Sequence, residues 1–265
     1  MCQNCFTPLL GHYCSECGQK STDVKYTLKS MITDLFFSAF HVEKKGLFHS
    51  VRELTLRPGM AIKKVLMGQR QYLYPPFKYL VLLGAIVIIF SLRYKFFHNE
   101  FTALEEDELP SWIYLTHEHR TYLANFFRFA EDEATLLNII TIPVFALFSW
   151  AFLSGGKYNF AENLILNTFV TAQQLLFLIV LVPLLEIIPG QKILLIQIYS
   201  AATMVYNIWV YYQFFDGHKL ALAIKSVVVV ILAYVYQFPV NLGIYYLYHH
   251  YLEEHFHWVP QVIAG

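Results

Sequence analysis

All four cysteines of the chain stand near its start, in the order CQNCFTPLLGHYCSEC. They form two Cys-x-x-Cys pairs, a spacing that brings four thiolates to one metal ion in the closed tetrahedral arrangement of structural Zn²⁺. Gly18 follows the second pair and allows a tight turn in which backbone N–H groups approach the sulfurs. We therefore expect a zinc-ribbon-like head over residues 1–20, with no open position for catalysis. The expected ligands are Cys2, Cys5, Cys14 and Cys17.

Two other uses of paired cysteines are less compatible with this sequence. Disulfides form in oxidising compartments, whereas the charge pattern described below places this end of the chain in the cytoplasm. A thioredoxin-like dithiol lies in a βαβ pattern, and no such pattern surrounds either pair. His12 lies between the pairs and is an alternative ligand, although a solvated turn histidine is its expected role.

The elements that carry this head are strongly apolar. Hydrophobic residues make up 57% of the 265 residues and charged residues only 14%, whereas soluble domains carry about 25% charged residues. Because about 20 apolar residues cross a bilayer as a helix, we expect an all-α integral membrane protein whose membrane domain occupies residues 75–248. The N-terminus shows no signal-peptide pattern, so the first span is expected to remain in the protein. The five predicted spans are 75–93, 136–154, 163–188, 193–215 and 219–247.

The distribution of charge predicts the orientation in the membrane. Eleven of the nineteen Lys and Arg residues stand at or before the entry to the first span, the last of them at Lys78. The next loop, 94–135, is acidic. Since Lys and Arg concentrate on cytoplasmic flanks, the N-terminus is expected inside. Five spans then place the loops at Lys157 and Lys219 inside and the C-terminus outside.

Residues 21–74 form a basic juxtamembrane segment with amphipathic helical patterns. One wide apolar face runs from Leu28 to Phe40, and shorter patterns lie on both sides of the breaker Arg57-Pro-Gly. Such helices lie in the membrane interface, with the apolar face towards acyl chains and the cations towards lipid phosphates. Packing of the same faces on the spans is an equally open alternative. The candidate headgroup ligands are Arg57, Lys63, Lys64 and Arg70.

A family resemblance rests on the order of several short motifs. The chain reads CxNC…GHYCSECGQ, then KGL…LRPGMAI…GQR…YPPFKYL before the first span. This order resembles a family of bacterial membrane proteins catalogued as a domain of unknown function, specifically through about residue 85. The resemblance implies a bacterial inner-membrane protein with zinc on the four cysteines, and it implies no activity. A cytosolic head followed by five spans is also similar in architecture to Yip-family trafficking proteins, although fold alone does not carry function.

Polar side chains inside the spans are functional candidates, because they are costly in lipid. One helix face of the third span carries four of them, which line a hydrated route or hydrogen-bond neighbouring helices. Helix packing is the expected role, and leucine at Asn167 and Gln174 should then cost little. No internal repeat divides the five spans into two halves, which weakens a transporter interpretation. The four residues are Asn163, Asn167, Thr171 and Gln174.

Two further segments carry weaker signals. The aromatic stretch from Trp112 to Phe129 in the acidic loop is typical of a helix at the outer interface. In the tail, 249–265, His249 and His250 each stand four residues before a glutamate. A solvated amphipathic tail is the expected role there, and metal binding is the alternative.

The sequence favours a function other than catalysis. It shows no Ser/His/Asp set, phosphate-binding loop or nucleotide fingerprint, and its basic charge lies at the membrane flank, so nucleic acid is not an expected partner. We expect a non-enzymatic membrane protein whose cytoplasmic head and neck dock a protein partner, as a scaffold or assembly subunit. The alternative is a transporter of lipid or a small solute that uses the polar face of the third span. A cavity at the membrane midplane would favour transport, and a filled core with an exposed apolar surface would favour docking.

Overall fold

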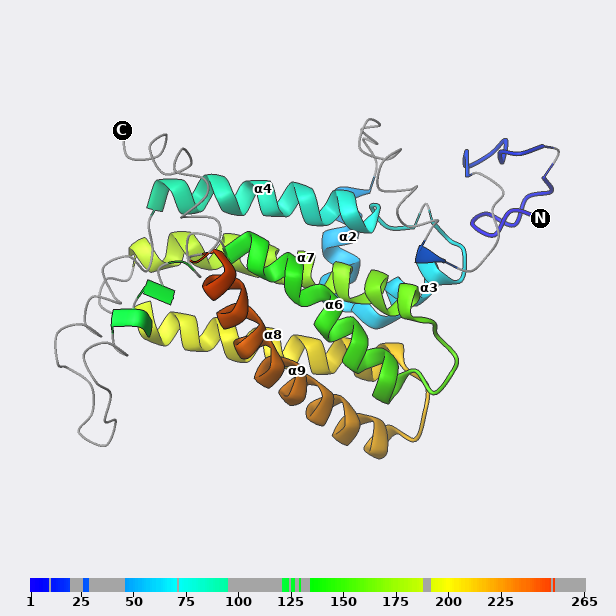
Figure 1. Ribbon diagram of the computed structural model, residues 1–265. Helices are drawn as coiled ribbons and strands as arrows, with labels where there is room; N and C mark the ends of the chain where they lie inside the picture. Colours follow the sequence, from blue (N-terminus) through cyan, green and yellow to red (C-terminus); the bar gives the residue numbers. More distant parts are fainter. Residues whose placement is uncertain are drawn as a thin grey trace.

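The computed structural model describes residues 1–9, 11–19, 26–28, 46–70, 72–94, 121–123, 125–126, 129, 134–187, 192–248 and 250. Its helices are α2 (Leu47–Leu56), α3 (Pro58–Leu66), α4 (Pro76–Tyr94), α6 (Ala134–Leu153), α7 (Phe160–Ile187), α8 (Lys192–Phe214) and α9 (Lys219–Leu247). Figure 1 shows α4, α7 and α8 running along the long axis of the molecule, with the head beyond α2 and α3 at one end. No strand occurs in the described residues, so the predicted all-α class is confirmed for them.

Each of the five predicted apolar stretches is a helix, with ends within three residues of the expected positions. Two of these helices are long and apolar enough to cross a membrane, by length and composition: Phe160–Leu181 and Lys219–Leu247. The apolar stretches of α4 and α6 are shorter, Pro76–Phe90 and Leu137–Leu153. The five predicted helices are thus confirmed, whereas five membrane crossings stay a prediction.

A capping box places the start of α7 three residues before the predicted span. The Glu162 carboxylate accepts a hydrogen bond from the Asn159 backbone N–H at 2.8 Å, and the Asn159 side-chain oxygen accepts one from the Glu162 N–H at 2.9 Å. These bonds satisfy N–H groups that a helix start otherwise leaves free. The prolines at 143, 183 and 239 lie inside α6, α7 and α9, and each helix continues through its proline.

Helix α7 forms the centre of the bundle. It packs against α2, α3, α4, α6 and α8. Of an apolar 18-residue segment within Phe160–Leu181, 56% is buried inside the protein, whereas only 28% of such a segment within Lys219–Leu247 of α9 is buried. Helices α6 and α8 each pack on both α7 and α9, so α6, α7, α8 and α9 form a closed ring. All four helices of this ring line the cavity described below.

Helices α2 and α3 form a hairpin that packs into the bundle. The side chains of Leu54 and Ile62 are fully buried, and the Tyr206 hydroxyl donates to the Leu54 carbonyl oxygen at 2.8 Å. A Cβ atom on Gly59 would lie 2.6 Å from the Phe214 backbone nitrogen, so only glycine lets α3 approach α8 this closely. Core packing, one of the two alternatives for the neck, is therefore observed for this hairpin. The predicted apolar face from Leu28 to Phe40 lies outside the described residues, apart from Leu28 itself.

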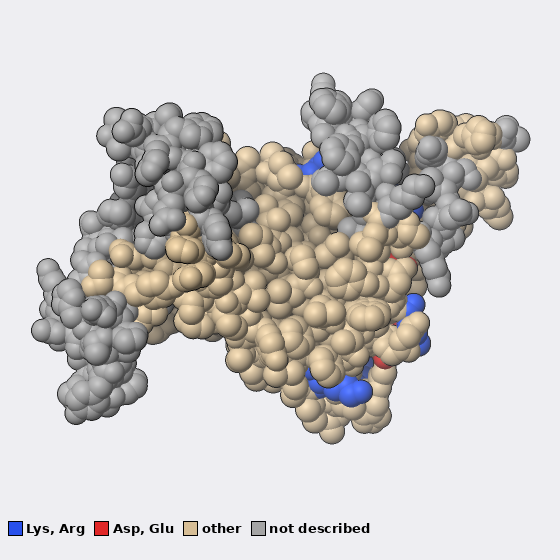
Figure 2. Space-filling view, in the orientation of Figure 1, with Lys and Arg blue, Asp and Glu red and all other residues tan. Residues whose placement is uncertain are grey.

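Charged side chains gather at the head end of the molecule. Within the described residues most of them lie in the head, in α2 and α3, in the loops at this end, and near the adjoining ends of α4, α7 and α9, whereas Arg93, Glu186 and Lys192 stand at the far ends of α4, α7 and α8. Asp216, between α8 and α9, pairs with Lys63 at 2.6 Å and with Lys157 at 3.5 Å. Figure 2 shows the blue and red side chains in the half of this face nearer the head. The head thus shares one end with the loops at Lys157 and Lys219, as the five-span topology requires.

Candidate metal centre and polar cavity

The four cysteine sulfurs converge on one point. All four Sγ atoms lie within 4.8 Å of one another. Three of the pairs are close: Cys2 and Cys17 at 3.5 Å, Cys5 and Cys14 at 3.4 Å, and Cys5 and Cys17 at 3.6 Å. A tetrahedral zinc ion with Zn–S bonds of about 2.3 Å separates its sulfurs by about 3.8 Å, whereas a disulfide brings two sulfurs to about 2.05 Å. The arrangement therefore fits one four-thiolate metal ion, and the four cysteines are free of disulfides.

The two Cys-x-x-Cys pairs have the same backbone turn. In the first, the Phe6 N–H donates to the Cys2 carbonyl oxygen at 3.0 Å; in the second, the Gly18 N–H donates to the Cys14 carbonyl oxygen at 3.0 Å. Phe6 and Gly18 both have positive φ, 60° and 72°. Glycine adopts this conformation without strain, whereas it costs another residue about 1–2 kcal/mol. The glycine predicted to make the second turn does so, and a phenylalanine makes the equivalent turn of the first.

Hydrogen bonds to the sulfurs favour the thiolate form that binds metal. The Thr7 hydroxyl lies 3.3 Å from the Cys5 sulfur, and this contact, with a hydrogen bond from the Thr7 backbone, lowers the pKa of Cys5 to about 6. A backbone hydrogen bond from Cys5 lowers the pKa of Cys2. Desolvation raises the pKa of Cys17 to about 11. A bound cation would offset that penalty, because a coordinating thiol is deprotonated outright.

The head is fastened to the loop that joins α3 to α4. The Gln19 side-chain amide donates to the Gly68 carbonyl oxygen at 2.7 Å, in a buried position. The Gln3 side chain covers the space that a Cβ on Gly68 would occupy, and Gly68 has a φ of 103°. Farther along, the Arg70 guanidinium lies over the Tyr26 ring at 4.3 Å, and the Tyr26 carbonyl oxygen accepts from the Asn159 side chain at 3.0 Å. One glutamine from each side of the metal centre thus contacts a single glycine.

Three of the four candidate headgroup ligands contact protein groups. Lys63 pairs with Asp216, and Lys64 lies 3.1 Å from the Tyr72 hydroxyl and 4.2 Å from the centre of its ring. Arg70 stacks on Tyr26, as above. Arg57 is exposed at the turn between α2 and α3. Lipid contact by these residues stays a prediction.

The polar residues on this face of α7 fall into two sets, one that is hydrogen-bonded within the protein and one that is not. Asn163 and Asn167 belong to a buried network: the Asn167 amide donates to Ser149 Oγ at 3.1 Å, Ser149 donates to Asn163 Oδ1 at 2.9 Å, and Tyr211 donates to Asn167 Oδ1 at 2.6 Å. This network joins α6, α7 and α8, as helix packing predicts. In contrast, Gln174 Nε2 is buried without a hydrogen-bond partner. Gln173, beside it, faces the hairpin and α4, donating to Thr55 and accepting from Tyr79.

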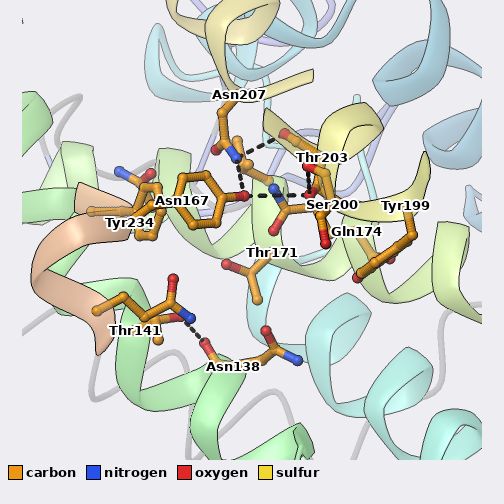
Figure 3. A pocket seen from close by; sticks show the side chains of 13 residues that line it. Asn138, Thr141, Asn167, Thr171, Gln174, Tyr199, Ser200, Thr203, Asn207 and Tyr234 are labelled. Atoms are coloured by element: carbon orange, nitrogen blue, oxygen red, sulfur yellow. Dashed lines mark hydrogen bonds between the residues drawn. The ribbon is translucent and has the colours of Figure 1, made fainter. Parts of the chain in front are cut away.

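Beyond this network, the four helices of the ring line a polar cavity of about 180 Å³. Figure 3 shows Thr171 and Gln174 of α7 facing one space, with Asn207 and Thr203 of α8 and Tyr234 of α9 beside it. The cavity lies midway along α7, α8 and α9. Its polar lining consists of amides and hydroxyls: Asn138, Thr141, Asn167, Thr171, Gln174, Tyr199, Ser200, Thr203, Asn207, Tyr234 and Gln237. In the sequence, the α7 residues, Asn207 and Gln237 stand out as polar groups inside apolar spans, but the other lining residues do not.

The outer aromatic segment and the tail are described only in part. Phe126 and Phe129 are buried, and both rings contact Tyr245 near the end of α9, at centroid distances of 5.7 and 5.3 Å. Part of the predicted aromatic segment thus packs on the bundle. His250 stacks on Tyr246, with ring centroids 5.6 Å apart. His249 and the residues from 251 onward lie outside the described residues, so the predicted tail stays untested.

A scan against models of known protein families finds no match to this chain, and searches of curated proteins and of solved structures find none either. The resemblance to the four-cysteine membrane family therefore stays a prediction. Function must be argued from the metal centre and the cavity alone.

Proposed function

We propose that this is a non-enzymatic, five-span membrane protein that binds a small polar molecule in its helix bundle, in the manner of a transporter. Its four-cysteine head holds structural zinc at the cytoplasmic end. This places the transport alternative ahead of the docking function that the sequence favoured. The observation that carries the change is the polar cavity midway along the bundle.

The distribution of side chains supports the membrane part of the proposal. In the described residues, the middle parts of α4, α6, α7, α8 and α9 carry no Asp, Glu, Lys or Arg, and the charged residues at their far ends, Arg93, Glu186 and Lys192, stand at or next to a helix terminus. Large apolar side chains such as Val205, Val235 and Ile89 are more than 60% exposed on the bundle surface. Such a surface is stable when it faces acyl chains and is a liability in water. The basic head end then lies at the cytoplasmic headgroups, in a bacterial inner membrane if the family resemblance holds.

The chemistry of the lining supports binding rather than catalysis. Amides and hydroxyls supply hydrogen-bond donors and acceptors, and no Asp, Glu, His, Lys or Cys stands among the described lining residues to act as a general acid or base near neutral pH. Polar groups at this depth are costly unless they bind one another, water or a ligand. Asn163 and Asn167 are satisfied by the protein, whereas Gln174 is not. A hydrated, ligand-accepting cavity explains this difference.

Water access to the cavity tests this function. Ser200 lines the cavity and is exposed, and Val205 projects outward from the same helix. We expect a charged aqueous thiol reagent to label Ser200→Cys, but not Val205→Cys, in protein reconstituted in lipid nanodiscs. Mass spectrometry of peptides separates these positions from the native cysteines. If Ser200→Cys is unlabelled, the cavity is not a solute site, and if Val205→Cys is labelled as strongly, α8 is not in lipid.

Docking of a protein partner by the head is the second candidate. Phe6 and Tyr13 are 64% and 62% exposed on the described part of the head. Phe6 also occupies a strained positive-φ position that glycine would fill more easily. A partner with an apolar surface would cover these rings. Phe6→Ser with Tyr13→Ser should then abolish co-purification of a specific protein while zinc content stays unchanged.

A further inference from the structure

We propose that the ligand of the cavity is a neutral polyhydroxylated molecule, a polyol or a sugar. The inference rests on the proposed function, since it names the chemical class that the same cavity binds. It starts from the absence of charged side chains among the described lining residues. An ion taken from water into such a site would lose its hydration without gaining an opposite charge, which is strongly unfavourable. An anion, a cation or a zwitterion is therefore a poor fit.

The polar groups of the lining match hydroxyl groups in kind. Asparagine and glutamine amides present a donor and an acceptor side by side, and each serine or threonine hydroxyl does both. A ligand hydroxyl also donates and accepts, so it can pair with either type of group without leaving one unmatched. Gln174 Nε2 is a buried donor without a partner, and an oxygen acceptor of the ligand would satisfy it.

The partners of the other lining residues leave further capacity for a ligand. Tyr234 donates to Thr203 Oγ1 at 3.3 Å and accepts from the Asn207 amide at 3.3 Å. The Tyr199 hydroxyl donates to the backbone carbonyl oxygen of Gln174, also at 3.3 Å. These bonds are long compared with the usual 2.7–2.8 Å for hydroxyl donors to oxygen and about 2.9–3.0 Å for N–H donors. A ligand hydroxyl can replace them at little cost, whereas the 2.6 Å bond from Tyr211 to Asn167 belongs to the fixed wall.

Aromatic rings complete the match. The cavity is also lined by Phe145, Tyr199 and Tyr234, and the Phe145 and Tyr234 rings meet edge to face at 5.2 Å. A sugar or cyclic polyol has hydroxyls at its edge and C–H groups on its faces. Small-molecule sites combine apolar and aromatic walls with a few placed polar groups. Such a ligand needs amides that reach the hydroxyls at its edge and aromatic rings that pack against its C–H faces.

The test is binding to the zinc-loaded full chain in nanodiscs, measured by saturation-transfer NMR and calorimetry. The probes are glycerol, myo-inositol and glucose as neutral polyols, with glycine as a zwitterion and inorganic phosphate as an anion. We expect at least one polyol to bind at millimolar concentration or tighter, and neither charged probe to bind. Gln174→Leu should weaken binding about tenfold, the effect of one lost hydrogen bond of about 1.4 kcal/mol. Gln197→Leu, the same change at an exposed position of α8, should leave it unchanged.

A second arm distinguishes a free polyol from a lipid headgroup of the same chemistry. Nanodiscs that contain a monoglycosyl diacylglycerol should compete with the soluble polyol if the headgroup is the ligand, and should not compete otherwise. Binding of phosphate or glycine, no binding of any polyol at tens of millimolar, or polyol binding unaffected by Gln174→Leu would overturn the assignment. If Ser200→Cys is labelled while no polyol binds, only the ligand class is wrong. If neither result is positive, the proposed function fails with it.

Discussion

The side chain of Gln19 donates a hydrogen bond of 2.7 Å to the carbonyl oxygen of Gly68, forty-nine positions along the chain. Gln19 ends the second cysteine turn, and Gly68 follows the helix that packs on α8. Within the described residues, this buried hydrogen bond and the Gln3 side chain beside it connect the metal centre to the loop between α3 and α4. This arrangement makes the position of the head testable.

Replacing Gln19 with leucine should release the head without unfolding the bundle. The Gly68 carbonyl would lose its buried donor, at a cost of about 1–3 kcal/mol. We expect faster hydrogen exchange over residues 1–19 and unchanged exchange in α7. Gln197→Leu makes the same change at an exposed position and is the control. Equal protection of the head in Gln19→Leu would show that this contact does not hold it.

The metal centre should contain about one zinc ion per chain, because four thiolates close its coordination. Elemental analysis of protein purified under reducing conditions measures this directly. Cys14→Ser with Cys17→Ser should abolish zinc binding and loosen the head, while the helical content of the bundle stays the same. A preparation without metal in which the cysteine turns are still protected from hydrogen exchange would contradict the assignment.

Gly59→Ala should destabilise the protein by about 1–3 kcal/mol, the usual cost of overpacking. The added Cβ would lie 2.6 Å from the Phe214 nitrogen and 2.7 Å from the Val210 carbonyl oxygen. Backbone atoms cannot move aside as a flexible side chain can. Gly217→Ala is the matched control, since a Cβ there meets nothing within 4 Å. Thermal unfolding in detergent measures both, and equal melting temperatures would show that α3 does not pack on α8 in this way.

The ion pair of Asp216 should make stability depend on pH in the acid range. A hydrogen bond from Lys63 lowers the pKa of Asp216. Burial acts to lower the pKa of Lys63, but Asp216 and Tyr158 together outweigh this effect and raise it. A lowered carboxyl pKa gives stability that is present above the ordinary value of about 4 and is lost as the pH falls through the folded value. Because the carboxylate is 48% exposed, we expect less than about 1 kcal/mol.

Denaturant unfolding at a series of pH values tests the ion pair. Asp216→Asn should remove the part of the acid dependence that belongs to this pair. High salt should weaken the same contribution in the unaltered protein, because the pair is exposed. An identical acid profile in Asp216→Asn would show that the pair adds nothing to stability.

Leucine replacements should distinguish the hydrogen-bonded Asn167 of α7 from the unpartnered Gln174. Asn167→Leu leaves the buried hydroxyls of Tyr211 and Ser149 short of a partner, so we expect a loss of about 1–3 kcal/mol. This differs from the sequence-based expectation that both replacements cost little. Gln174→Leu removes an amide whose Nε2 has no partner, so stability should hold while ligand binding falls. Unfolding measurements that rank the two variants the other way would contradict this division.

The sequence determined the local features, because each depends on a short range of residues. Two Cys-x-x-Cys pairs at this spacing indicate a four-thiolate metal site, and Gly18 has the positive φ that its position requires. Long apolar runs specified five helices to within three residues. The largest deviation, the start of α7 three residues before the predicted span, also has a local cause. Asn159 and Glu162 form a capping box, and both residues are visible in the sequence.

Only the tertiary structure decided which faces meet. Asn167 and Gln174 stand on one helix face in sequence, yet Tyr211 of α8 and Ser149 of α6 satisfy the first and leave the second. The partners come from helices far apart in the chain, and the 3.6-residue periodicity of one helix does not reveal its neighbours. For the same reason, the cavity required all four helices of the ring. The docking of the head on Gly68 likewise depends on an approach between distant segments that no local pattern encodes.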